Sequence, residues 1–406
     1  MSKSVKGGSS RVRRVAIGAL GASLAGSVLL GMGPPEALPG LGQYLVIAQN
    51  DLGMHCMQRD YSYFMILPPF NTVHAMVIKR GFPEPDIIDP VATDSVDIYI
   101  PSNTTSIDKT NWWEHAPALL GVDNPADIGV TGSAIGGSMT PDGAQKIWEI
   151  TAMPMTPMND AGIDNPYPLA TVVYKKQGTE KARTQMVVPV SWELNCALCH
   201  GNPVPGENTD LDVLQDHDRL HGTNLEAMAP VACSSCHADP ALGAPGDPNL
   251  PTLSSAIHTA HADRINDLPV PLLDACYACH PGERAQCQRD VHLLQEGMTC
   301  MDCHISMQAV GNPARTPWVD EPSCGDCHSR PGFDFEQPGV LFRNSKGHGG
   351  VKCFVCHGSP HAITPTPAEA DNIQSIRLQG VAGTLSDCTV CHIQMPNESF
   401  FHKVDD

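Results

Sequence analysis

Fourteen of the 16 cysteines fall in seven Cys-x-x-Cys-His motifs. Two thiols at this spacing can add to the two vinyl groups on one porphyrin edge, and the adjacent histidine can then bind the iron. Disulfides and zinc ribbons also use cysteine pairs, but neither requires a histidine directly after every second cysteine. The pattern therefore predicts seven covalently attached c-type haems. The motif cysteines are Cys196, Cys199, Cys233, Cys236, Cys276, Cys279, Cys300, Cys303, Cys324, Cys327, Cys353, Cys356, Cys388 and Cys391.

The motif histidines are the expected proximal iron ligands. They are His200, His237, His280, His304, His328, His357 and His392. Eleven further histidines remain: three lie before residue 191, seven lie among the motifs, and His402 lies near the C-terminus. The seven among the motifs equal the number of distal ligands that seven six-coordinate irons need. The expected distal ligands are His217, His221, His258, His261, His292, His348 and His361.

Local spacing supports several of these ligands. His217 and His221 are four positions apart on a short helix expected from Asp210 to His221, so they share a face and can serve two adjacent haems. His258 and His261, three positions apart, have the same property. His402 and His55 stay open as further candidates.

Cys56 and Cys287 belong to no motif. An unpaired thiol is a liability in an oxidising compartment, so a disulfide between these two residues is one expectation. Such a bond would tie the two halves of the chain together.

Composition divides the chain at about residue 190. Cys56 is the single cysteine of residues 41–190. Short β-branched and aromatic segments at 44–48, 72–78 and 96–100 are bounded by proline and glycine. Segments 169–175 and 184–190 flank Gln177-Gly178 and are typical of a hairpin. We expect a small β-rich leader domain over 41–190, with the character of a β-sandwich.

Residues 191–406 show little sustained periodicity and supply few aromatic side chains. Such a segment buries too little apolar surface to fold unaided, and covalently bound porphyrins would fill that need. The expected fold class is therefore mixed: a β-rich N-terminal domain followed by a largely irregular, short-helix multihaem cytochrome c domain over 191–406.

Residues 1–40 have the layout of an export signal. Arg11, Arg13 and Arg14 precede an uncharged apolar run from 15 to 32, and Gly33-Pro34-Pro35 follows. An uncleaved N-terminal anchor is the alternative to a cleaved signal. We expect an exported protein that is periplasmic, associated with the outer membrane or extracellular.

The formal net charge is −19. A chain this acidic repels phosphate backbones, which argues against nucleic acid as a partner. The acidity suits solubility, and it also suits docking to basic redox proteins or to positively charged mineral surfaces.

The C-terminal half resembles the multihaem c-type cytochromes of dissimilatory metal-reducing bacteria. The resemblance rests on residues 217–225 (HDRLHGTNL), 230–237 (PVACSSCH), 345–350 (SKGHGG) and 388–392 (CTVCH). Residues 50–57 (NDLGMHCM) and 66–71 (ILPPFN) are similar to a leader module of such cytochromes. The resemblance implies low-spin bis-histidine haems in stacked and T-shaped pairs, and some relatives polymerise, so self-assembly is a possible partner interaction.

Two functions remain in competition. An electron carrier in extracytoplasmic or extracellular respiration needs two protein ligands on every iron, and the histidine count favours it. A multihaem reductase of a small oxyanion needs one iron with an open distal position and nearby proton donors. All seven motifs end in histidine, which counts against reductases that use a motif lysine.

Overall fold

The computed structural model describes residues 41–201, 208–265, 275–331, 333, 335–397 and 402. Residues 1–40, with the predicted export signal, lie outside the described residues. Within the described ranges, no helix has the length and apolar character needed to cross a membrane.

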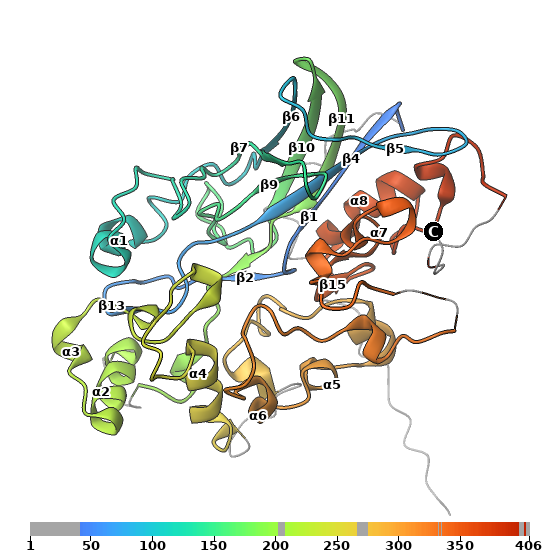
Figure 1. Ribbon diagram of the computed structural model, residues 1–406. Helices are drawn as coiled ribbons and strands as arrows, with labels where there is room; N and C mark the ends of the chain where they lie inside the picture. Colours follow the sequence, from blue (N-terminus) through green and yellow to red (C-terminus); the bar gives the residue numbers. More distant parts are fainter. Residues whose placement is uncertain are drawn as a thin grey trace, which may run out of the picture.

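Two antiparallel sheets form the N-terminal half (Figure 1). The five-stranded sheet contains β1 (Tyr44–Asn50), β4 (Val73–Lys79), β9 (Ile147–Ile150), β8 (Thr140–Asp142) and β5 (Asp86–Ile87). The four-stranded sheet contains β11 (Thr179–Val187), β10 (Leu169–Lys176), β6 (Asp94–Tyr99) and β7 (Gly137–Ser138). Buried residues of both sheets, among them Val46, Val77, Ile98, Val172 and Trp148, share one apolar cluster. The two sheets therefore pack face to face around this core.

The strand predictions for this half are confirmed in detail. Segments 44–48, 72–78 and 96–100 lie largely within β1, β4 and β6. Strands β10 and β11 form the predicted hairpin, and Gln177 and Gly178 both have positive φ, 50° and 75°. A two-residue turn of this kind matches the twist of the paired strands.

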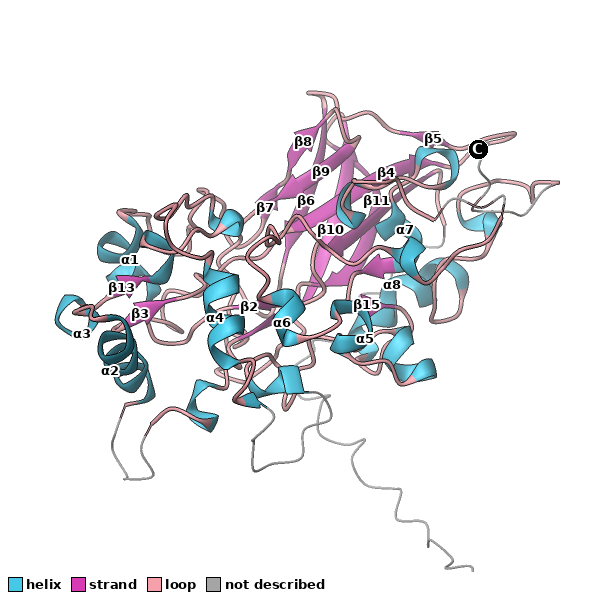
Figure 2. Cartoon of the chain, turned by 60° about the horizontal axis from the view of Figure 1, so that its bottom comes forward, coloured by secondary structure: helices cyan, strands magenta, loops and turns pink. Residues whose placement is uncertain are grey.

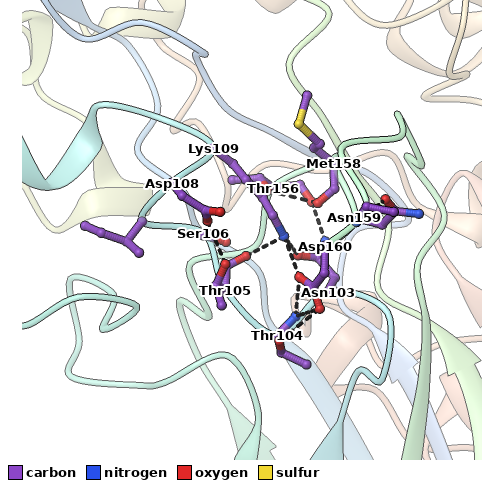
Figure 3. Close-up of polar contacts among 12 residues, drawn as sticks. Asn103, Thr104, Thr105, Ser106, Asp108, Lys109, Thr156, Met158, Asn159 and Asp160 are labelled. Carbon is purple, nitrogen blue, oxygen red and sulfur yellow. Dashed lines mark hydrogen bonds and ion pairs between the residues drawn. The ribbon is translucent and has the colours of Figure 1, made fainter.

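The connection from β6 to α1 (Trp112–Leu120) is irregular, and a buried lysine holds it in place (Figure 3). Lys109 Nζ donates to Asn103 Oδ1 at 2.9 Å and forms an ion pair with Asp160 Oδ1 at 2.8 Å. Burial would raise the pKa of Asp160, but the hydrogen bonds from Lys109 and Thr104 leave it below its usual value. This network orders the loop without strand pairing.

The outer face of the five-stranded sheet is covered by the C-terminal half. Ile47, Met76 and Ile78 point away from the sandwich core and pack in a second apolar cluster. This cluster also contains Phe354 and Val355 of α7 (Cys353–His357). Strand β1 is thus buried on both faces, which explains its continuous apolar sequence.

Polar contacts strengthen this junction. Gln374 of α8 (Glu369–Gln379) accepts a hydrogen bond from Ala48 N and donates one to Ala48 O, both at 3.1 Å. Strand β12 (Val190–Ser191) pairs in parallel with β2 (His55–Cys56). Strand β13 (Val231–Ala232) pairs in parallel with β3 (Phe64–Met65). The two halves therefore share backbone hydrogen bonds as well as a core.

The C-terminal half consists of short helices and turns along one side of the sandwich (Figures 1 and 2). Its remaining α-helices and strands are α2 (Thr209–His221), α3 (Leu225–Met228), α4 (Leu253–His261), α5 (Cys300–His304), α6 (Met307–Val310), β14 (Gly358–Ser359) and β15 (Ala362–Ile363). In both views α2 and α3 lie at one end and α7 and α8 at the other. The predicted helix from Asp210 to His221 is confirmed as α2, and Gly222 ends it in the left-handed conformation.

Candidate functional site

All seven Cys-x-x-Cys-His motifs fold as a single helical turn. In five of them the histidine N–H donates to the carbonyl of the first cysteine, at 2.8–3.0 Å. The other two motifs form the short helices α5 and α7. One turn brings the two cysteine side chains to the same side and places the histidine next to them, as attachment to one porphyrin edge requires.

Every motif histidine faces one histidine from outside the motifs. The pairs, with the distances between ring centres, are His200–His261 (6.1 Å), His237–His217 (6.4 Å), His280–His258 (6.2 Å), His304–His361 (6.1 Å), His328–His292 (5.9 Å), His357–His402 (5.9 Å) and His392–His348 (6.2 Å). Each pair and its cysteines are named below after the motif histidine, for example the His200 site.

This separation fits an iron between the two rings. Imidazoles bound to opposite sides of one metal ion have ring centres about 6 Å apart, since each metal–nitrogen bond is about 2 Å long. Ordinary aromatic pairs occupy a similar range of distances. Ordinary aromatic packing, however, does not explain why each of the seven motif histidines is paired with a different histidine from outside the motifs.

Backbone carbonyls fix the orientation of several of these rings. Nδ1 lies at hydrogen-bond distance from a carbonyl oxygen in His237 (Pro251, 2.8 Å), His258 (Ser254, 2.7 Å), His261 (Ile257, 2.7 Å), His361 (Leu52, 3.1 Å) and His392 (Pro83, 3.3 Å). A carbonyl oxygen only accepts, so Nδ1 carries the proton and Nε2 keeps its lone pair. Metal-binding histidines are held in the same way.

The three histidines of the β-rich half are arranged differently. Nε2 of His55 contacts Asp51 at 2.7 Å, Nε2 of His74 contacts Glu149 at 3.5 Å, and Nε2 of His115 lies 3.4 Å from Ser62 Oγ. Burial would raise the pKa of Asp51, but the charge and hydrogen bond of His55 outweigh it and lower that pKa. Nε2 of His55 is thus occupied by Asp51, whereas each motif histidine faces a different histidine.

The set of facing histidines differs from the expected distal ligands at one position. The ring of His221 lies 4.8 Å from that of His217, on the same face of α2, and all seven motif histidines have other partners. His402 takes the place expected for His221 and faces His357. The expectation that His217 and His221 serve two haems is thus corrected, because only His217 reaches a motif histidine.

Helix α4 positions two of the facing histidines. Thr252 accepts a hydrogen bond from Ser255 N at 3.2 Å and so starts this helix. His258 then faces His280, and His261, almost one turn later, faces His200. The i, i+3 spacing thus serves two different sites, as the sequence predicts.

Carboxylates lie next to two of the sites. Nδ1 of His200 is 3.5 Å from Asp212 and 3.7 Å from Asp216, which share one face of α2. Asn208 starts this helix by accepting hydrogen bonds from Asp210 N and Leu211 N. At the His328 site, Nδ1 of the facing His292 lies 3.0 Å from Asp290. A carboxylate at Nδ1 makes an imidazole a more basic ligand.

Residues 50–57 support the His304 site through their backbone. Besides the hydrogen bond from His361 to Leu52 O, Arg289 donates to Gly53 O at 2.7 Å. A Cβ on Gly53 would lie 2.0 Å from Pro360 O, so only glycine fits there. The sequence of residues 50–57 resembles a leader module, but the contacts that this segment makes here use its backbone carbonyl groups. A side-chain motif does not reveal such contacts.

The structure brings the two remaining cysteines together. A side-chain hydrogen bond joins Cys287 to Cys56, and together with burial it raises the pKa of the Cys287 thiol well above its usual value. Cys56 belongs to β2 in the β-rich half, whereas Cys287 follows the His280 motif. The thiol pair therefore spans the junction between the halves.

We expect these thiols to form a disulfide when the protein matures in an oxidising compartment, because they are already in contact. Non-reducing proteolysis and mass spectrometry should give a peptide that joins Cys56 to Cys287, lighter by H₂ than the two reduced peptides. Recovery of both residues as free thiols under non-reducing conditions, after rapid alkylation of the unfolded chain, would contradict this expectation.

Apolar side chains at the motifs are left open to solvent. Leu198 and Met301 lie inside motifs and are 41% and 40% exposed, and Ile305 and Ile393, directly after motif histidines, are 77% and 60% exposed. A porphyrin has large apolar faces that would cover such residues. These four side chains are thus free to pack against an attached porphyrin.

Two buried motif histidines have pKa values that favour the neutral imidazole. Burial lowers the pKa of His304 and that of His357 to about 4, so both imidazoles are neutral at ordinary pH. Neutral imidazole is the form that binds metal ions. The motif residues therefore fit seven attached haems in number and in local geometry.

No family model, curated protein or solved structure matches this chain. The resemblance to multihaem cytochromes accordingly rests on the motifs and on the facing histidines.

Proposed function

We propose that the chain is a seven-haem cytochrome c that transfers electrons. The main support for this proposal is that each motif histidine faces a second histidine, with 5.9–6.4 Å between the ring centres. The seven pairs of motif cysteines would bind the haems by thioether bonds. When bound, each haem supplies an iron that changes between its ferric and ferrous states.

The protein's own contribution is to hold the ligands still. Carbonyl acceptors such as Pro251 and Ile257 keep the rings of His237 and His261 in one orientation. Two fixed imidazoles can remain bound in both oxidation states, so electron transfer needs little rearrangement. Closely spaced sites with this property act as a conductor.

The alternative, a reductase of a small oxyanion, requires an iron with an open distal position. All seven motif histidines lie within the described residues, and each of them has a facing histidine. This arrangement favours a carrier over an enzyme.

The predicted export signal and the formal net charge of −19 support a role outside the cytoplasm, in extracytoplasmic or extracellular respiration. The partners we propose are basic redox proteins or mineral electron acceptors. Self-assembly remains an expectation from the resemblance.

Carbon monoxide binding separates the two functions. The reduced protein should bind almost no carbon monoxide, and electron paramagnetic resonance of the oxidised protein should show only low-spin ferric haem. A carbon monoxide complex at one haem in seven, with a high-spin ferric signal of matching intensity, would favour the reductase.

The carboxylates beside His200 give a prediction about potential. The double variant Asp212→Asn/Asp216→Asn removes two negative charges near Nδ1 of His200, which stabilise the ferric state. Both aspartates are partly exposed, so the effect is screened, and we expect one of the haem potentials to rise by about 30–60 mV, a three- to tenfold change in equilibrium constant.

Spectroelectrochemical titration measures this shift. Asp123→Asn, an exposed aspartate of the β-rich half, is the matched control and should leave all potentials unchanged. An unchanged titration curve in the double variant would mean that the carboxylates do not tune this site.

A further inference from the structure

Contacts between neighbouring sites establish a spatial order that differs from the order of the motifs in the sequence. Helix α2 joins the first two sites: His217 faces His237, while Asp212 and Asp216 of the same helix lie beside His200. The His237 site is therefore next to the His200 site, with one short helix between them.

The next neighbour of the His200 site is the His280 site. Both receive their second histidine from α4, as His261 and His258. In addition, Asn195 N donates to Cys279 O at 3.4 Å, and Asn195 Nδ2 donates to Tyr277 O at 3.0 Å. The residue before the first motif thus touches the third motif directly.

The His280 site is followed by the His304 site. Gln288, in the segment after the His280 motif, donates to Met298 O at 3.2 Å, just before Cys300. Arg289 N, in the same segment, donates to the carbonyl of His361, which faces His304. On the other side, Thr259 of α4 donates to Gly311 O at 3.1 Å, after α6.

The remaining three sites continue the line. The segment that leads to the Cys300 motif carries His292, which faces His328, so the His304 site adjoins the His328 site. The ring of Phe335 lies 6.1 Å from that of His328 and 5.4 Å from that of His402, which faces His357. Leu385 N donates to Cys356 O at 2.9 Å, which joins the His357 site to the segment that enters the last motif.

We infer that the seven haems form one unbranched line in the order His237, His200, His280, His304, His328, His357 and His392. Electrons then enter and leave at the His237 and His392 ends. This inference rests on the proposed function and adds the path to it. The ribbon agrees, since α2 and α7 lie at opposite ends with α4, α6 and α5 between them (Figures 1 and 2).

The exchange of the first two motifs is the testable part. If the haems were arranged in the order of their motifs in the sequence, the His200 site would be at the end of the line. The His237 site would then lie inside the line. The order inferred from the contacts puts the His237 site at the end, and every electron that reaches it must first cross the His200 site.

Timed electron injection distinguishes the two orders. A ruthenium photoreductant is attached at Met395→Cys, an exposed position three residues after His392. Electron traps are made by His261→Met at the His200 site and by His217→Met at the His237 site, because methionine ligation raises the potential of a haem. Light then injects one electron into the fully oxidised protein.

We expect the trap at the His200 site to fill before the trap at the His237 site. Injection from Met228→Cys, an exposed position near the other end, should reverse this order. Filling of the His237 trap first, or simultaneous filling, with the label at Met395 would overturn the inference. A pyridine haemochrome count below seven in the unmodified protein would instead refute the proposed function.

A density map of the unmodified holoprotein provides a second test that needs no variant. The iron bound by His200 should lie between those bound by His237 and His280. An iron of the His237 site that is closer to the iron of the His280 site than to that of the His200 site would also overturn the inferred order.

Discussion

Replacement of His402 by alanine should make one haem in seven reactive toward carbon monoxide. His402 is the histidine that faces His357, at 5.9 Å between ring centres. Without it the iron of the His357 site loses its second axial ligand, since the other facing histidines are paired with other motifs. The measurement is a carbon monoxide titration of the reduced variant, followed by its Soret band.

His221→Ala is the matched control, because it removes the same side chain from the position that the sequence favoured. It should leave every haem six-coordinate, since His221 lies beside His217 and faces no motif histidine. If His221→Ala binds carbon monoxide and His402→Ala does not, His221 is the distal ligand that the sequence predicts. The placement of His402 opposite His357 would then be wrong.

Replacement of Arg289 by methionine should lower the free energy of unfolding by about 3–5 kcal/mol, the usual cost of breaking a buried ion pair. The guanidinium is 1% exposed and binds Asp371 through two hydrogen bonds, at 2.6 and 2.9 Å. It also donates to Gly53 O, so it joins α8, residues 50–57 and the segment after the His280 motif. Its loss leaves the buried Asp371 carboxylate without its counter-charge, with the hydrogen bond from Thr366 Oγ1 remaining.

Urea unfolding of the holoprotein measures this effect. Arg284→Met, which breaks the exposed ion pair with Asp164, is the control and should cost less than about 1 kcal/mol. The double variant Arg289→Met/Asp371→Leu should recover much of the lost stability, because no buried charge remains unpaired. Equal losses in the two single arginine variants would contradict the role given to the buried pair.

Local features were predictable from the sequence because they depend on neighbouring residues. The Cys-x-x-Cys-His spacing determines one helical turn, Gln177-Gly178 favours a two-residue hairpin turn, and Gly222 ends α2. The i, i+3 spacing of His258 and His261 likewise shows that they can serve two sites. Each of these features follows from a few adjacent positions.

Long-range features could not be predicted in this way. His217 and His221 have the same spacing signal, and only the packing of α2 against the His237 motif decides between them. His402 lies 45 residues from its partner His357, as their numbers show, and nothing nearby marks it. The supporting carbonyl of Leu52 and the exchanged order of the first two sites depend on contacts between segments that are far apart in the sequence.

The most direct test of the central claim is a pyridine haemochrome assay of the purified protein combined with its intact mass. We predict seven haems per chain, with the mass of the polypeptide raised by seven covalently bound porphyrins. A colourless protein whose mass equals that of the bare polypeptide would contradict the proposed function and, with it, the inferred path of electrons.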